Sequence, residues 1–175
     1  FGLARSIQRQ ADLELEQLGQ RVAQAVQQRI EAPTEGLRGL RGMLEATQAL
    51  AQEPLTRYVR SRELLQRFPG VQGFGLALPA AGSYVWTAFE PAVGVTAPQG
   101  SLGQEPAWRA GLDAAVAEGQ AQLSAPTPAG WLLVLPLFHA QRPLQSAQQR
   151  VDALQALLLA PLRPRELFQG LDALA

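Results

Sequence analysis

The side chains that could support catalysis or metal binding are few and far apart in this sequence. The single histidine, His139, follows the aromatic end of a predicted strand without a carboxylate near it, so we expect it to be structural or to face solvent. Cysteine is absent, and the aspartates form no close pair: Asp12, Asp113, Asp152 and Asp172. No glycine-rich phosphate loop, metal-ligand spacing or nucleophile–base arrangement occurs. The sequence therefore predicts no catalytic residue, metal site or cofactor in these 175 residues.

The charge distribution argues against a polyanionic partner. The formal net charge is zero, and all 15 basic residues are arginines scattered among glutamates, so we predict no nucleic-acid binding. Apolar residues make up 47% of the chain, which suffices for one core or for one domain with a helical extension. No apolar run reaches the roughly 18 residues of a membrane-spanning helix. Because the chain opens abruptly and ends within a helical pattern, we expect a piece of a longer, membrane-anchored protein.

Residues 3–32 have the pattern of one long amphipathic helix. Its apolar positions follow one another in steps of three and four: Ala4, Ile7, Ala11, Leu15, Leu18, Val22, Val26 and Ile30. Such spacing gives a nearly straight seam against a partner helix. A helix of this length exceeds what a small domain needs, so we predict a homodimer interface at Ile7, Ala11, Leu15, Leu18 and Val22. The alternative is that the stripe packs on the sheet of its own domain.

Two further helical segments precede the first strand. Pro33-Thr34 predicts a break or kink, and a second segment then carries Leu37, Leu40, Leu44 and Leu50 on one face. Glycines at 36, 39 and 42 indicate either close helix–helix approach or flexibility. A third helix is predicted over 55–68, where Pro69-Gly70 stops it. We divide the chain into dimerisation helices over 1–53 and a second domain over 54–175 that ends in a C-terminal exit helix.

The rest of the chain has the pattern of a sheet with one crossover helix. Strands are predicted over 71–78, 84–89, 120–125 and 131–138, with a hairpin turn over 79–83 and a helix from Pro106 to Gly119. Residues 142–150 are ambiguous, residues 151–159 fit strand or helix, and Pro164 starts a last helix through Leu174. The predicted class is α+β: a mostly antiparallel sheet whose one face the N-terminal helices cover.

Several segments, in order along the chain, carry a family pattern. They are the helix-to-strand step Phe68-Pro69-Gly70-Val71-Gln72 within 56–78, the helix and turn WRAGLDAAVAEGQAQLSAP over 108–126, the strand GWLLVLPLF over 130–138, and Ala160-Pro161-Leu162-Arg163. Together they resemble the CHASE domain, an extracytoplasmic sensory domain of bacterial and plant receptors, over about residues 50–170.

The resemblance implies a fold and a role. The fold is a long N-terminal helix followed by a PAS-like α/β structure between two transmembrane helices, with at most a reduced second PAS-like subdomain. It also assigns residues 151–159 to a strand. The role is the periplasmic, ligand-sensing input of an inner-membrane histidine kinase or cyclic-di-GMP enzyme, without catalysis in this fragment. The alternative is a non-sensory helical adaptor that mediates protein contacts.

In PAS-like sheets the ligand lies between the sheet and its connecting segments. We therefore predict a small-molecule site from inward strand residues and the crossover helix: Phe74, Leu76, Trp86, Ala88, Arg109, Leu123, Ser124, Trp131, Leu133 and Leu135. Plant cytokinin-binding members carry an aspartate just before the crossover helix, whereas residues 99–104 here contain none, although a pocket leucine is retained at Leu123. We accordingly expect a small, largely apolar or weakly anionic ligand rather than a cytokinin.

Overall fold

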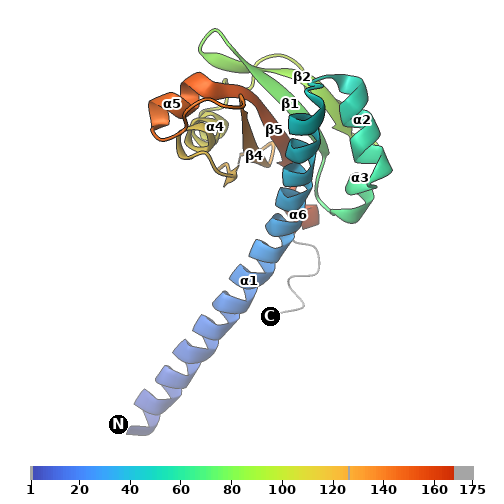
Figure 1. Cartoon of the computed structure of the whole chain (residues 1–175). Coiled ribbons are helices and arrows are strands. Elements are labelled where there is room, and N and C mark those ends of the chain that lie inside the picture. The colour runs from blue at the N-terminus through green and yellow to red at the C-terminus, as the bar shows by residue number, and fades with distance from the viewer. Residues whose placement is uncertain (1, 126, 168–175) are drawn as a thin grey trace.

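A long N-terminal helix leads into a five-stranded sheet with shorter helices around it (Figure 1). The computed structural model describes residues 2–125 and 127–167. The elements are α1 (Gly2–Thr47), α2 (Gln52–Ser61), α3 (Leu64–Arg67), β1 (Gly73–Ala80), β2 (Ser83–Pro91), α4 (Pro106–Glu118), β3 (Gln122–Leu123), β4 (Trp131–Phe138), α5 (Ala147–Ala153), β5 (Leu154–Leu162) and α6 (Pro164–Leu167). The predicted α+β class is confirmed.

All neighbouring strands in the sheet are antiparallel. The order is β2-β1-β5-β4-β3, which places the last strand of the chain at the centre. β1 and β2 form a hairpin that closes at the pair Ala80–Ser83, and β4 pairs with β5 from Trp131–Leu162 to Phe138–Leu154. The predicted hairpin and the strand over 131–138 are therefore correct.

Helices cover the sheet on both faces (Figure 1). Alternate residues of β4 and β5 divide between two cores, as the pleat of a strand requires. Leu133, Leu135 and Leu158 pack with α1 and α2 on what we call the α1 face, whereas Leu132 and Leu157 pack with α4 on the α4 face. The sequence predicted that the N-terminal helices cover one face, which is the α1 face, and the structure shows that α4 covers the other.

The break predicted at Pro33 is wrong, because α1 continues through this residue. A proline inside a helix removes one hydrogen bond and costs about 3 kcal/mol. Here Pro33 and Thr34 are buried, and the Thr34 hydroxyl donates to the Ile30 carbonyl oxygen at 2.8 Å. Leu37 and Leu40, which follow on the same face, are completely buried in the core of the α1 face. Packing therefore outweighs the local cost, and one helix joins the projecting segment to the sheet.

Two of the glycines in α1 permit close approach of aromatic rings. A β-carbon at Gly36 would lie 3.1 Å from the ring of Phe68, and one at Gly39 would collide with the Tyr58 hydroxyl. Nothing lies within 4 Å of such an atom at Gly42. Close packing thus explains Gly36 and Gly39, the choice that the sequence left open.

Some predicted boundaries need correction. The helix predicted over 55–68 is two helices, because Glu63 adopts a left-handed conformation (φ 53°) between α2 and α3. Residues 151–153 belong to α5 rather than to a strand, since Ser146 and Gln149 form a capping box that starts a helix. β5 then begins at Leu154, so the strand implied by the family resemblance is right from there to residue 159. The final helix is present as α6, while its predicted part over 168–174 lies outside the described residues.

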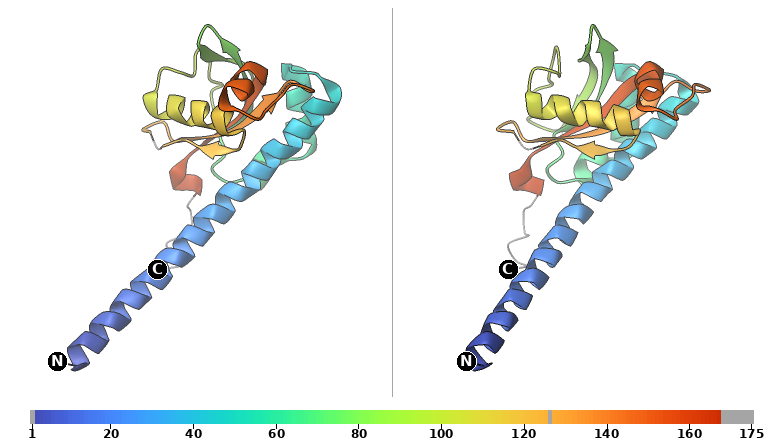
Figure 2. Two further views of the ribbon diagram at one scale, coloured as in Figure 1. Left: turned by 60° about the vertical axis from the view of Figure 1, so that its left-hand side comes forward. Right: turned by 90° about the vertical axis from the view of Figure 1, so that its left-hand side faces the viewer.

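The N-terminal half of α1 projects from the rest of the domain (Figure 2). Ile7 and Leu15 on the predicted dimer stripe are 61% and 67% exposed. Ala11 is exposed too, and Leu18 and Val22 are partly exposed. Across the described residues, no helix combines the length and apolar character needed to cross a membrane. The division at residue 53 stays a prediction about roles, since α1 shares its core with the sheet.

We predict that the two halves of α1 respond differently to the same substitution. Leu40→Ala should lower the free energy of unfolding by about 2–5 kcal/mol, because Leu40 is completely buried. Leu13→Ala, at a position 57% exposed and off the stripe, should change it by less than about 0.5 kcal/mol. Urea denaturation followed by circular dichroism measures both. Equal losses in the two variants would contradict the placement of α1 in the core.

Candidate functional site

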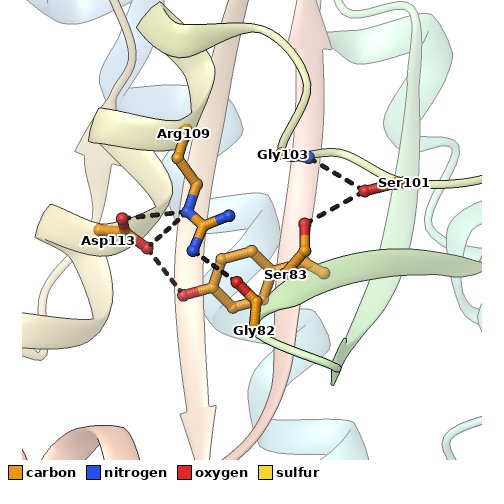
Figure 3. Close-up of polar contacts among 7 residues, drawn as sticks. Gly82, Ser83, Ser101, Gly103, Arg109 and Asp113 are labelled. Atoms are coloured by element: carbon orange, nitrogen blue, oxygen red, sulfur yellow. Dashed lines mark hydrogen bonds and ion pairs between the residues drawn. The ribbon is translucent and has the colours of Figure 1, made fainter.

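The tip of the β1–β2 hairpin meets α4 at one edge of the α4 face. The hairpin turns at Ala81 and Gly82, both with positive φ (46° and 76°), which is the backbone of a two-residue turn matched to strand twist. Glycine adopts this conformation freely, whereas an alanine there is strained. The turn places the Gly82 carbonyl and the Tyr84 side chain opposite the first turns of α4 (Figure 3).

Arg109 and Asp113 of α4 form the charged centre of this edge (Figure 3). They are four residues apart and therefore neighbours on one helix face. The Arg109 Nε donates to the two carboxylate oxygens of Asp113 at 3.2 and 3.1 Å, and its Nη2 donates to the Gly82 carbonyl at 2.6 Å. The guanidinium carbon lies 5.7 Å from the centre of the Tyr84 ring. One side chain thus ties α4 to the hairpin tip.

Tyr84 supplies a hydroxyl that stays protonated. Its side chain is 9% exposed, and the hydroxyl donates to an Asp113 carboxylate oxygen at 3.1 Å. Burial, followed by the charge of Asp113 and this hydrogen bond, raises the pKa of Tyr84 to about 12 against the opposing effect of Arg109. The phenol is therefore a neutral donor across the physiological range.

A segment of the loop before α4 pairs with β2 beside the hairpin tip. The Leu102 amide donates to the Tyr84 carbonyl and the Trp86 amide to the Gly100 carbonyl, so residues 100–102 pair with the outer edge of β2. The hydroxyls of Ser83 and Ser101 lie 3.1 Å apart. A β-carbon at Gly103 would collide with the Ser83 hydroxyl and lie 2.8 Å from the Arg109 Nη1, so a larger residue there would displace these side chains.

These groups open onto a cleft of about 560 Å³. This volume is in the range of small-molecule sites. Its polar end carries Ser83, Tyr84, Arg109 and Asp113, and its other walls are the hairpin tip with apolar residues of α4, α5 and β5: Val116, Ala117, Val151 and Leu154. The described residues contain no group of three or more histidine, aspartate or glutamate side chains that could hold a metal ion.

A second cleft, of about 580 Å³, lies where α1, α4 and the loop after β4 meet. Two arginines that line it donate to backbone carbonyls: Arg142 to Asp152 at 3.1 Å, and Arg150 to Ala117 at 2.5 Å and to Leu144 at 2.7 Å. Arg150 thereby ties the C-terminal end of α4 to the loop before α5. We assign these arginines a structural role and take the cleft at Arg109 as the candidate site.

The predicted site residues fall on both faces of the sheet. Most belong to the packed core of the α1 face or pack against it: Phe74, Leu76, Ala88, Leu123, Trp131, Leu133 and Leu135. Trp86 packs against the core of the α4 face, and Arg109 lines the cleft there. Ser124 is buried, and its hydroxyl accepts from the Leu132 amide at 2.8 Å. Their role in ligand binding stays a prediction, and the geometry brings only Arg109 to the cleft.

Three polar residues of the cleft were missed in the sequence: Ser83, Tyr84 and Asp113. Asp113 carries a visible signal, since its spacing of four from Arg109 predicts an ion pair on one helix face. Tyr84 carries none, because its contact with Asp113 spans 29 residues of chain. The sequence led us to expect a small, largely apolar or weakly anionic ligand, whereas this cleft carries an aspartate, Asp113, beside its arginine.

Comparison with known proteins gives the family. Residues 83–175, which include Tyr84, Arg109 and Asp113, match the CHASE domain. The chain belongs to the CHASE domain family. The resemblance seen in the sequence is thus confirmed, although its first segment, over 56–78, lies outside the matched residues of this CHASE domain.

A solved structure shows the same fold. It is the ligand-binding domain of the amino acid chemoreceptor PctC of Pseudomonas aeruginosa PAO1 in complex with GABA, with a TM-score of 0.57 and 18% sequence identity. The likeness covers 91% of this CHASE domain and 66% of that chain, so this chain spans slightly less than two thirds of the chemoreceptor domain. The predicted PAS-like fold is confirmed. No curated protein matches this CHASE domain in sequence.

We predict that Tyr84 makes the CHASE domain less stable in alkali. Between about pH 10 and pH 12 the unfolded chain releases the phenolic proton while the folded chain keeps it, so stability falls as pH rises, by up to about 1.4 kcal/mol per pH unit. Tyr84→Phe should remove this slope, and Tyr58→Phe should retain it. Urea denaturation at several pH values measures the effect, and the absence of lysine and cysteine leaves few other groups to titrate there. A slope unchanged in Tyr84→Phe would contradict the assignment.

Proposed function

We propose that this CHASE domain is the extracytoplasmic ligand-sensing input of a membrane-bound bacterial receptor, with a histidine kinase or cyclic-di-GMP enzyme as its output. One observation carries the proposal: a PAS-like domain of a sensory family has a cleft of about 560 Å³ with an arginine, an aspartate and a tyrosine at one end. The complex of the PctC domain with GABA supports a small molecule as the ligand of such a fold.

The ligand would act by replacing the contacts of Arg109. In the structure the guanidinium is held by Asp113 and by the Gly82 carbonyl. A ligand that takes over the second contact would release the hairpin tip from α4. Because β1 continues from this tip into the sheet beside β5, the strand would carry the change inward.

The central strand offers a path from the cleft to α1. Leu157 and Leu159 of β5 pack on the α4 face, while Leu158 between them packs on the α1 face with Leu37 and Leu40 of α1. Residues that alternate along one strand move together, so a shift on one face reaches the other. Signalling then requires the ligand to bind one arrangement of α1 more tightly than the other.

The projecting half of α1 is proposed to pair with α1 of a second copy. Its exposed apolar positions share one face: Ile7, Ala11, Leu15, Leu18 and Val22. Exposed aliphatic side chains at 3–4 spacing over several turns are typical of a helix seam. Dimeric pairing would let a shift of each α1 act on its counterpart.

A thermal-shift screen against a broad metabolite library tests the sensing proposal. A ligand at about 100 times its dissociation constant should stabilise the protein by about 2.7 kcal/mol. Arg109→Ala should abolish the shift, whereas Arg142→Ala, which alters the other cleft, should retain it. Retention of the shift in Arg109→Ala would move the binding site elsewhere. A library without any stabilising compound would favour the alternative role of a protein-binding adaptor.

Single cysteines in this cysteine-free chain test the dimer. Leu15→Cys, on the stripe and 67% exposed, should form a disulfide-linked dimer on mild oxidation. Leu13→Cys, 57% exposed on another face of the same helix, should form little. Non-reducing gel electrophoresis of the protein in its membrane-anchored form measures both. Equal cross-linking at the two positions would contradict a seam along the predicted stripe.

A further inference from the structure

We propose that the ligand of the cleft at Arg109 is a small molecule of zero net charge that carries one anionic and one cationic group. The inference rests on the proposed sensing function and names the chemical class of the ligand. It follows from the balance of charges and hydrogen bonds in the cleft, and it replaces the largely apolar or weakly anionic ligand that we expected from the sequence.

The charges that line the cleft cancel. Among the described residues along its walls, Arg109 and Asp113 are the two charged ones, and they neutralise each other at 3.1 Å. Tyr84, the third ionisable group, is a neutral phenol at physiological pH, and burial raises its pKa further, to about 12. An incoming ligand therefore meets one positive and one negative group side by side, on walls whose own charges sum to zero.

Binding covers both groups, and this penalises a ligand with a single charge. The side chains of Arg109 and Asp113 are 37% and 53% exposed, so both are accessible to water. A bound molecule displaces that water. A carboxylate alone on the guanidinium would add a second negative charge beside Asp113, and an amine alone would add a second positive charge beside Arg109. An unbalanced charge in a covered site is costly, so a ligand with both groups avoids either excess.

Such a ligand can replace the hydrogen bond between Arg109 and Gly82 without leaving either group unpaired. Its carboxylate would accept from the guanidinium, whose planar shape suits two parallel bonds to a carboxylate. Its ammonium would donate to the Gly82 carbonyl that Arg109 releases and to Asp113. The donor and the acceptor of the present 2.6 Å bond both regain a partner. A ligand without a hydrogen-bond donor would cover that carbonyl and leave it unpaired, and an ammonium supplies this donor together with the charge that balances Asp113.

The remaining walls favour a short aliphatic body. Val116, Ala117 and Leu154 line the cleft, together with Val151, which is 52% exposed. These side chains offer contact area to methylene groups and no further hydrogen bonds. Amino acids with short aliphatic chains therefore match the cleft in charge, polarity and surface.

A thermal-shift screen grouped by charge class tests the inference. Its matched set shares one five-carbon skeleton: L-norvaline, 5-aminopentanoate, pentanoate and pentylammonium. Aliphatic zwitterions of other lengths, monocarboxylates and monoamines extend each class. We expect the stabilising compounds to be zwitterions, with dissociation constants by calorimetry at least about tenfold below those of their singly charged analogues. Comparing the dissociation constants of norvaline and 5-aminopentanoate shows which distance between ammonium and carboxylate fits the cleft.

Single neutralisations sharpen the test. Asp113→Asn leaves Arg109 as the charged group and should shift the preference toward monocarboxylates, and Arg109→Gln should shift it toward monoamines. Asp152→Asn, the same change at an exposed position of α5 outside the cleft, should leave the preference unchanged. Stabilisation confined to singly charged or uncharged compounds, or a preference that Asp113→Asn does not alter, would overturn the inference while the sensing function stands. No stabilising compound in any class would overturn both.

Discussion

The structure depends on a central strand that is apolar on both of its sides. From Ala156 to Leu162 every residue of β5 is buried, and β4 beside it is buried from Leu132 to Leu137. Since side chains alternate across a strand, each face of the sheet needs its own cover. α1 with α2 supplies one and α4 the other. Side chains fill the middle of both faces, so the candidate site lies at the edge, where the hairpin tip meets α4.

The need to cover each face of the sheet also explains why α1 runs unbroken from its projecting half onto the α1 face. Its apolar positions keep their steps of three and four from Val22 through Ile30 and Pro33 to Leu37, Leu40 and Leu44. The stripe that is exposed in the projecting half is therefore the same stripe that packs on the sheet further along. Any partner of the projecting half must approach from the side on which the domain lies. A displacement at Leu40 would reach this half through an unbroken helix.

Local signals predicted most elements of the fold, while contacts between distant segments decided the rest. The turn over 79–83 and the stop at Gly119 are written in adjacent residues, and both are correct. The break predicted at Pro33 was wrong because packing of α1 on the sheet compensates for the lost hydrogen bond, and the local sequence does not show this packing. The alternation of apolar residues predicted that Phe74 and Trp131 point inward. It could not tell whether the space they point into holds a ligand or is filled by core side chains. The partnership of Tyr84 with Asp113 exists only once the hairpin lies against α4.

The candidate site is built from contacts that hold the hairpin tip against α4. The turn at Ala81 adopts a strained positive φ, and the tip is restrained by Arg109 at Gly82 and by the Ser83–Ser101 contact. Under the proposed mechanism, a molecule that takes Arg109 from Gly82 must offset the loss of one short hydrogen bond. The positive φ of Ala81 belongs to the hairpin turn itself and does not depend on that bond. The ligand then shifts the population of two arrangements only by its difference in affinity for them.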